Sequence, residues 1–166
     1  RKAESGRQKA EGRGQKAEGR RQEAEGKPKK IKVGEKEECK KMKGHRDLIV
    51  FQLSYSLAMD IFNLSKKFPK EEIYSLTDQI RRSSRSVAVN IAEAFRKRRY
   101  PKMFVNKLSD SDAEATETQV WLDFAFDSGY LLRDDHDRLV SKYEEVGRML
   151  GSMMRSPERF VPTSGR

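Results

Sequence analysis

The sequence predicts an all-α protein, an antiparallel up-down-up-down four-helix bundle preceded by a disordered N-terminal extension. Three observations lead to this fold class. From residue 45 onward apolar residues recur at alternating spacings of three and four, which is the period of a helix face. Proline and glycine divide this region into four segments, and the connections are short enough for neighbouring helices to run antiparallel. No stretch alternates with period two for long enough to predict a sheet.

Residues 1–44 are predicted to be a disordered basic extension. Four heptapeptides follow one another there, KAESGRQ, KAEGRGQ, KAEGRRQ and EAEGKPK. Alanine is their only recurring apolar residue and each contains glycine, so they cannot form a coiled-coil seam. Two interpretations remain: a basic arm for phosphates or acidic partners, or translated sequence upstream of a true start at Met42, which we favour.

The first two helices are expected over residues 48–67 and 71–99, with Asp47 as the first N-cap and Pro69 ending the first helix. Each carries an apolar stripe predicted to face the core. The first stripe is Leu48, Phe51, Tyr55, Ala58 and Phe62. The second stripe is Ile73, Leu76, Ile80, Ser84, Val87, Ile91 and Phe95.

The third helix is expected from Pro101 to Gly129. The fourth is expected from Asp134, its predicted N-cap, to Pro157, and Asp137 would complete a capping box with Asp134. The third stripe is Phe104, Leu108, Ser111, Ala115, Thr118, Leu122 and Ala125. The fourth stripe is His136, Leu139, Tyr143, Val146, Leu150 and Met153. The bundle is thus placed at residues 45–155, with a flexible tail at residues 156–166.

The basic charge is concentrated outside the predicted bundle. The net charge is +10, of which residues 1–44 contribute +8 and residues 45–166 only +2. The single cysteine, Cys39, excludes an intrachain disulfide and fits a reducing compartment. No apolar run reaches the ~18–20 residues of a membrane helix, and no secretory signal is present. We therefore expect a cytoplasmic protein with no membrane association.

One stretch, RRSSRSVAVNIAEAFRKRR at residues 81–99, is strongly basic around a short apolar centre. Its guanidinium groups could contact phosphates. The candidate nucleic-acid-binding residues are Arg81, Arg82, Arg85, Arg96, Lys97, Arg98 and Arg99. Ala88 and Ala92 lie on the same side and would instead permit close approach of another subunit.

The charge distribution leaves both interpretations of this basic face open. Residues 81–107 carry a net charge of +8, whereas residues 110–137 carry −8. The second and third helices could therefore pair with one another, within a subunit or between subunits. Tyr100 alone is well placed for base stacking, a common feature of nucleic-acid sites.

Three further residues are candidates for structural or interface roles. Asn90 lies beside the core stripe and is expected to fix helix register, and Glu93 is expected to pair with a nearby arginine. Trp121 is assigned to the core or to a subunit interface.

Catalytic, metal and cofactor sites are not predicted. The segment SDSDAE has calcium-loop spacing, but Ala115 and Trp121 stand where the loop needs Gly and Glu. The segment DDHD at residues 134–137 is explained better by helix capping than by a metal. Neither histidine has a partner for nucleophilic catalysis, and no phosphate-binding glycine loop occurs. We expect a protein that is not an enzyme.

The same residues carry a resemblance to a known family. The motifs are Arg46-Asp47-Leu48, Phe51-Gln52, Phe68-Pro69, Gln79-Ile80-Arg81-Arg82 and Asn90-Ile91-Ala92-Glu93. In order and spacing they resemble the four-helix bundle proteins found in intervening sequences of bacterial 23S rRNA genes, over residues 44–154. Ala94 departs from the glycine that usually follows the last motif, and SDAEATETQVW departs from the family's third helix.

The resemblance implies a homo-oligomer, a pentamer in characterised relatives. It also implies similarity to the nucleic-acid-binding accessory bundle of diversity-generating retroelements, whose partner is a reverse transcriptase. The first hypothesis is accordingly an oligomeric bundle that binds structured RNA or DNA through the basic face. The alternative is an oligomeric protein adapter that uses this face for assembly.

Overall fold

The computed structural model describes residues 42–162, and within them the chain is all-helical with no strand. Four α-helices carry the fold: α1 (Ile49–Leu64), α2 (Leu76–Lys97), α3 (Pro101–Asp127) and α4 (Arg133–Arg155). This confirms the all-α prediction. The predictions for residues 1–41 and 163–166, including the disordered extension, lie outside the described residues.

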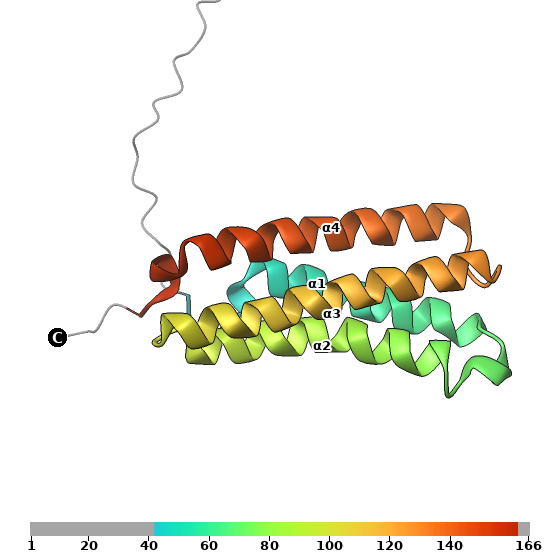
Figure 1. The fold of residues 1–166 in the computed structure, drawn as a ribbon, viewed down its shortest axis with the longest axis horizontal. Helices are drawn as coiled ribbons and strands as arrows, with labels where there is room; N and C mark the ends of the chain where they lie inside the picture. The colour runs from blue at the N-terminus through green and yellow to red at the C-terminus, as the bar shows by residue number, and fades with distance from the viewer. Residues whose placement is uncertain (1–41, 163–166) are drawn as a thin grey trace, which may run out of the picture. The chain divides into compact units, whose positions relative to one another are not determined.

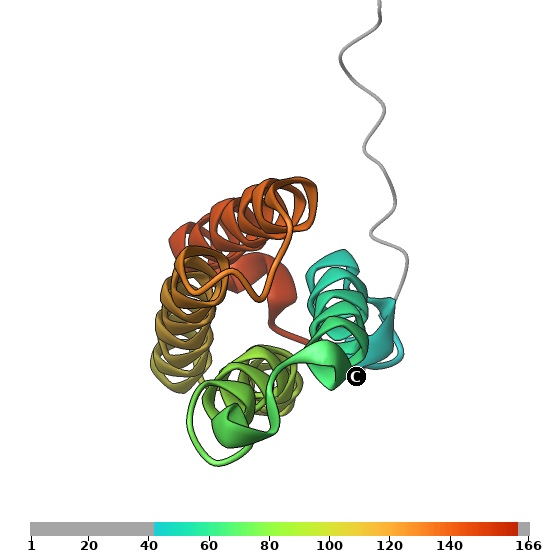
Figure 2. The same cartoon turned by 90° about the vertical axis from the view of Figure 1, so that its right-hand side faces the viewer.

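Consecutive helices lie side by side and reverse direction at each connection (Figure 1). The end-on view of Figure 2 shows the four helices around a common core, with α1 lying between α2 and α4. The contact between α2 and α3 is the most extensive, and the contact between α1 and α4 is the weakest of the four. The α1 side is therefore the more open side of the bundle.

The predicted stripes of α2, α3 and α4 meet in the core. All seven stripe residues of α3 are buried, as are those of α4 from Leu139 to Met153. On α2 the stripe is buried from Leu76 to Phe95. The core continues past the predicted end of the bundle, because residues 157–160 form a 3₁₀ turn that packs Phe160 against Phe104. The centres of these two rings lie 5.4 Å apart.

The predicted stripe of α1 was only partly correct, since Leu48 and Ala58 are buried but the three aromatic residues are not fully buried. Tyr55 is 57% exposed, and Phe51 and Phe62 are only partly buried. The buried face of α1 is Val50, Ser54, Leu57, Ala58 and Ile61. Apolar residues surround most of this helix, so their spacing fits several faces, and packing against α2 and α4 selects one of them.

The predicted N-caps of α1 and α4 were also wrong. Asp47 belongs to a preceding 3₁₀ turn (His45–Asp47), where its carboxylate accepts the backbone N–H groups of Lys43 and Gly44 at 2.7 and 3.1 Å. Helix α4 begins at Arg133, one residue before the predicted cap, and no side chain caps it. A carboxylate at this position can accept hydrogen bonds either from backbone N–H groups that precede it or from those of the helix that follows. The sequence spacing is the same in both cases and does not distinguish them.

Helix α2 begins at Leu76 rather than at residue 71. The intervening chain forms a 3₁₀ turn (Lys70–Glu72) and a further turn at residues 73–75, which leaves Ile73 45% exposed instead of in the core. His136, expected in the α4 stripe, is only partly buried. The end of α3 agrees with the prediction: Gly129 has φ +75° and Tyr130 N–H donates to the Ala125 carbonyl at 2.9 Å.

Candidate nucleic-acid interface

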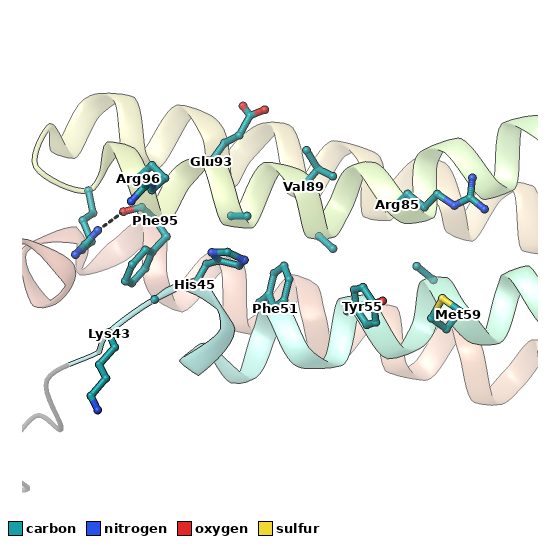
Figure 3. Close-up of a pocket in the computed structure, with 15 residues that line it drawn as sticks. Lys43, His45, Phe51, Tyr55, Met59, Arg85, Val89, Glu93, Phe95 and Arg96 are labelled. Carbon is teal, nitrogen blue, oxygen red and sulfur yellow. Dashed lines mark hydrogen bonds between the residues drawn. The ribbon is translucent and has the colours of Figure 1, made fainter.

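A groove of about 930 Å³ runs between α1 and α2 on the open side of the bundle. Figure 3 shows its two walls, with side chains of α1 and of the preceding turn pointing toward α2. Most of its lining is apolar. The charged and polar lining residues are Lys43, His45, Arg85, Glu93, Arg96 and Arg98.

A row of aromatic rings forms the α1 wall. The rings of His45 and Phe51 meet edge to face with centroids 4.7 Å apart, and those of Phe51 and Tyr55 lie 6.2 Å apart at an interplanar angle of 29°. The side chains of His45 and Phe51 point toward the α2 wall (Figure 3), and Tyr55 lines the groove beside them. Met59 continues the row and is 43% exposed.

Small residues and two arginines form the opposite wall. Ala88 is buried and Ala92 half-buried, so this side of α2 presents little bulk, and Val89 beside them is 54% exposed. Arg85 and Arg96 are exposed at separate points along this wall (Figure 3). Neither forms an ion pair with any residue of the described chain.

At one end of the basic face three cations surround one phenylalanine. The charged groups of Lys66, Arg81 and Arg85 lie 4.5, 5.1 and 5.6 Å from the centre of the Phe62 ring. Arg81 Nε also donates to Ser65 Oγ at 2.7 Å. Cation–π contact therefore holds several positive charges near one another without a carboxylate.

At the other end, basic residues cluster at the C-terminus of α2. The Arg98 guanidinium lies 3.8 Å from the centre of the Phe95 ring and donates to the Phe95 carbonyl at 2.7 Å. Burial lowers the pKa of Arg98, and repulsion from Arg99 and Arg96 lowers it further. Lys97 is half-buried, and Arg99 is exposed. This end of the bundle is accordingly electropositive.

Arg82 does not share this surface. It lies near Glu114 of α3, where burial and Glu117 raise the pKa of the Glu114 carboxyl and the charge of Arg82 lowers it. The predicted basic set thus divides: Arg82 is turned toward α3, whereas Arg81, Arg85, Arg96 and Arg98 lie on the α1 side. A one-residue step of 100° around the helix accounts for the separation.

Glu93 and Asn90 also face α3. Lys107 Nζ lies 3.0 Å from Glu93, 3.2 Å from Asp110 and 3.3 Å from Asn90 Oδ1. Hydrogen bonds to Glu93 and then Asp110 raise the pKa of Lys107. The partner of Glu93 is therefore a lysine of the next helix, not an arginine of its own, and Asn90 joins the same link between α2 and α3.

Comparisons with known proteins identify the fold's relatives. The sequence model of the 23S rRNA-intervening sequence protein family matches residues 46–152. The chain belongs to this family. A solved structure from Bacteroides thetaiotaomicron, described as a protein with unknown function from the S23 ribosomal protein family, is 30% identical, with a TM-score of 0.59. The similarity covers 64% of the present chain and 96% of that chain. No curated protein matches.

In this member of the 23S rRNA-intervening sequence protein family, two of the resembling motifs lie on α2. Gln79 to Arg82 and Asn90 to Glu93 are separated by about two turns of α2. Each motif contributes residues to both sides of the helix: Arg81 and Ala92 face α1, whereas Arg82 and Glu93 face α3.

The aromatic residues of the groove were missed by sequence reasoning. Phe51 and Tyr55 were assigned to the core stripe, and His45 was weighed only as a catalytic residue and set aside. The available signal was that α1 has more apolar residues than one buried face requires. Tyr100, the predicted stacking residue, is 63% exposed but does not line the groove.

The remaining candidate residues lie elsewhere. Trp121 is partly buried, donates Nε1–H to Glu117 at 3.0 Å and lies 5.7 Å from the exposed Phe124 ring. His136 lies between Asp123 and Asp137, at 2.8 Å from each. Over residues 42–162 no group of three or more His, Cys, Asp and Glu side chains is arranged to hold a metal ion. In the same range no helix is long and apolar enough to cross a bilayer.

Proposed function

We propose that this protein is a non-enzymatic, homo-oligomeric bundle that binds structured RNA or DNA through the basic side of α2. The observation that carries the proposal is the exposed, unpaired state of Arg85 and Arg96 within the described chain, beside Arg81 and Arg98. An ion pair with a carboxylate would occupy the guanidinium donors of an arginine. Arg85 and Arg96 have no such partner in the described chain, which leaves their hydrogen-bonding groups free for phosphates.

Oligomerisation would strengthen such binding without further contacts in each subunit. A repeated basic surface raises the effective concentration of the second and later contacts once the first has formed. The family resemblance supports a homo-oligomer, for which we propose a pentamer. By similarity to the retroelement accessory bundle, a reverse transcriptase is a proposed protein partner.

The test is a titration of the full-length protein with an RNA hairpin and with duplex DNA, at low and at physiological salt. The variant Arg85→Ala/Arg96→Ala removes two unpaired cations, and the control Lys142→Ala/Arg148→Ala removes two cations from the exposed face of α4. We expect the first variant to bind both ligands about tenfold or more weakly, at ~1 kcal/mol or more per contact. Equal binding by the two variants would refute the proposal, because loss of bulk charge alone would then explain the effect.

A second candidate function is an oligomeric protein adapter. The observation in its favour is the acidic outer side of α3, where Val120 and Phe124 are 47% and 53% exposed. A basic α2 face could dock there on a neighbouring subunit. In that case high salt dissociates the oligomer, Arg85→Ala/Arg96→Ala lowers the oligomer mass, and neither nucleic acid binds in a way that the variant changes.

A further inference from the structure

The groove between α1 and α2 combines three features that single-stranded nucleic acid requires. One wall is a row of aromatic rings, of which Tyr55 is the most exposed. On the opposite wall, Ala88 and Ala92 have short side chains, which leaves space between this wall and the aromatic rings. Cationic side chains stand along the same wall (Figure 3). Base stacking on aromatics next to a basic track is the common basis of single-strand recognition.

The size of the groove admits a single strand but not a duplex. The axes of packed helices lie ~8–10 Å apart, which limits the width of a groove between them. A B-form duplex is broader than this, because its major groove alone is ~12 Å wide. A duplex could contact only the rim. An unpaired base is flat and can enter between the Tyr55 ring and the alanine side of α2.

The charges along the groove match a phosphate backbone. Arg85 and Arg96 are eleven residues apart on one helix, which places them ~16 Å apart along its axis. Lys43 and Arg98 add two further cations at the Arg96 end. Glu93 is the single carboxylate among the lining residues, and Lys107 compensates its charge at 3.0 Å. The groove therefore presents a positive field along several nucleotides of an extended strand.

We propose that this groove binds unpaired nucleotides, with bases against the rings of Phe51 and Tyr55 and phosphates beside Arg85 and Arg96. The proposal rests on the proposed nucleic-acid function and specifies its substrate as a single strand, or as an unpaired loop of a structured RNA. The structured RNA or DNA of the proposed function contacts the rim arginines, and its unpaired bases enter the groove.

The test compares two oligonucleotides with the same number of phosphates. One is oligouridylate of about twelve nucleotides, and the other is an abasic strand of equal length, which carries the charge without the bases. The full-length protein is used, because charge-only binding to any other basic segment is the same for both strands. An oligodeoxyuridylate arm separates RNA from DNA as the source of the strand.

We expect wild-type protein to bind oligouridylate about fivefold or more tightly than the abasic strand, the effect of stacking one base. Tyr55→Ala should reduce this preference, since only Phe51 would then remain of the two stacking rings. Tyr55→Phe should keep the preference, and the control Tyr74→Ala should leave it unchanged, since Tyr74 is 93% exposed and outside the groove. Arg85→Ala should weaken binding of both strands equally. Because Tyr55 is largely exposed, these variants should keep the wild-type unfolding temperature, and that measurement accompanies each titration.

Two results would overturn the inference. Equal affinity for oligouridylate and the abasic strand, with hairpin binding still dependent on Arg85 and Arg96, would leave the proposed function standing and exclude stacking in the groove. A change of oligomer mass in Tyr55→Ala, without a change of base preference, would show that a second copy of the chain occupies the groove. Failure of the proposed function is distinguishable from both, because hairpin binding would then be independent of Arg85 and Arg96.

Discussion

Tyr143 is the largest side chain that the described bundle buries completely, and its hydroxyl has no hydrogen-bond partner there. Burial raises the pKa of this hydroxyl, and the nearby Thr118 hydroxyl opposes this in part, although the two groups do not meet hydrogen-bond geometry. Thr118 Oγ1 lies 2.9 Å from Ser83 Oγ and 2.8 Å from the Glu114 carbonyl, so its single hydroxyl proton is already engaged by these two oxygens. The Tyr143 ring thus fills the core while its polar atom is unpaired, at a cost in stability.

Tyr143→Phe is therefore expected to raise the free energy of unfolding by up to about 1 kcal/mol, since it removes an unpaired polar group and keeps the ring. Urea denaturation measures the change. Tyr143→Ala is the contrasting variant, with an expected loss of about 3–5 kcal/mol from the cavity. A loss greater than about 1 kcal/mol in Tyr143→Phe would mean that the hydroxyl is hydrogen-bonded in solution.

His136 of α4 contacts Asp123 of α3 and so links the two helices through a single side chain. Hydrogen bonds to Asp123 and then Asp137 raise the pKa of its imidazole, and its ring lies 4.8 Å from Phe126. A pKa raised on folding means that the folded state favours the protonated ring. The contribution to stability is therefore complete below the unfolded-state pKa of about 6.5 and is lost as pH rises through the higher folded-state pKa.

The corresponding prediction is that wild-type protein is more stable than His136→Gln at about pH 5.5 and loses most of that advantage by about pH 8.5. Both carboxylates are more than half exposed, so solvent screening keeps the difference small. Urea unfolding of both proteins at the two pH values provides the measurement. An advantage that is the same at both values would show that the imidazole proton is not involved.

At the scale of elements, α2 and α3 pack closely because small side chains line their contact. Ser83, Ser84 and Ser111 are buried, and Ser111 Oγ donates to the Val87 carbonyl of α2 at 2.9 Å. Small hydroxyl residues let the two backbones approach, and their polar atoms bond to nearby backbone or hydroxyl groups. The contrast with α1 is direct, since α1 is separated from α2 over part of its length by the groove.

The turn between α3 and α4 depends on one glycine. Gly129 has φ +75°, and a Cβ added there would meet nothing within 4 Å, so the cost of a side chain is conformational rather than steric. We expect Gly129→Ala to lower the free energy of unfolding by about 1–2 kcal/mol. Gly129→Asn should lower the free energy of unfolding less than Gly129→Ala does, because asparagine tolerates the left-handed backbone conformation. Equal losses for the two variants, measured by thermal or urea unfolding, would contradict the conformational explanation.

At the scale of the whole molecule, charge is separated by side. Unpaired arginines gather on the α1 side of α2, whereas acids dominate residues 110–137, which extend from α3 to the first turn of α4. Within one subunit, the ion pairs of Lys107 and the approach of Arg82 to Glu114 already bring some of these opposite charges together. The remaining positive charge is directed outward and is available to an external polyanion.

Salt dependence tests this view of the molecule. Each phosphate contact contributes about 0.7–0.9 to the slope of the logarithm of affinity against the logarithm of salt concentration, so Arg85→Ala/Arg96→Ala should reduce the magnitude of the slope by about 1.4–1.8. The α4 control, Lys142→Ala/Arg148→Ala, should retain the wild-type slope. An unchanged slope in the Arg85/Arg96 variant would place the phosphates on other cations.

The sequence by itself determined the helical class, the core faces of α2, α3 and α4 and the glycine that ends α3. Each of these depends on local spacing or on one backbone conformation, as Leu108, Tyr143 and Gly129 illustrate. Only the tertiary structure decided which face of α1 is buried, which carboxylates cap helix ends and which arginines share a surface. Tyr55 shows the reason for α1: apolar residues surround most of that helix, so only packing against its neighbours decides which face is buried. Arg82 shows the reason for α2: adjacent arginines point to different sides of the helix, and only the neighbouring helices decide what each side faces.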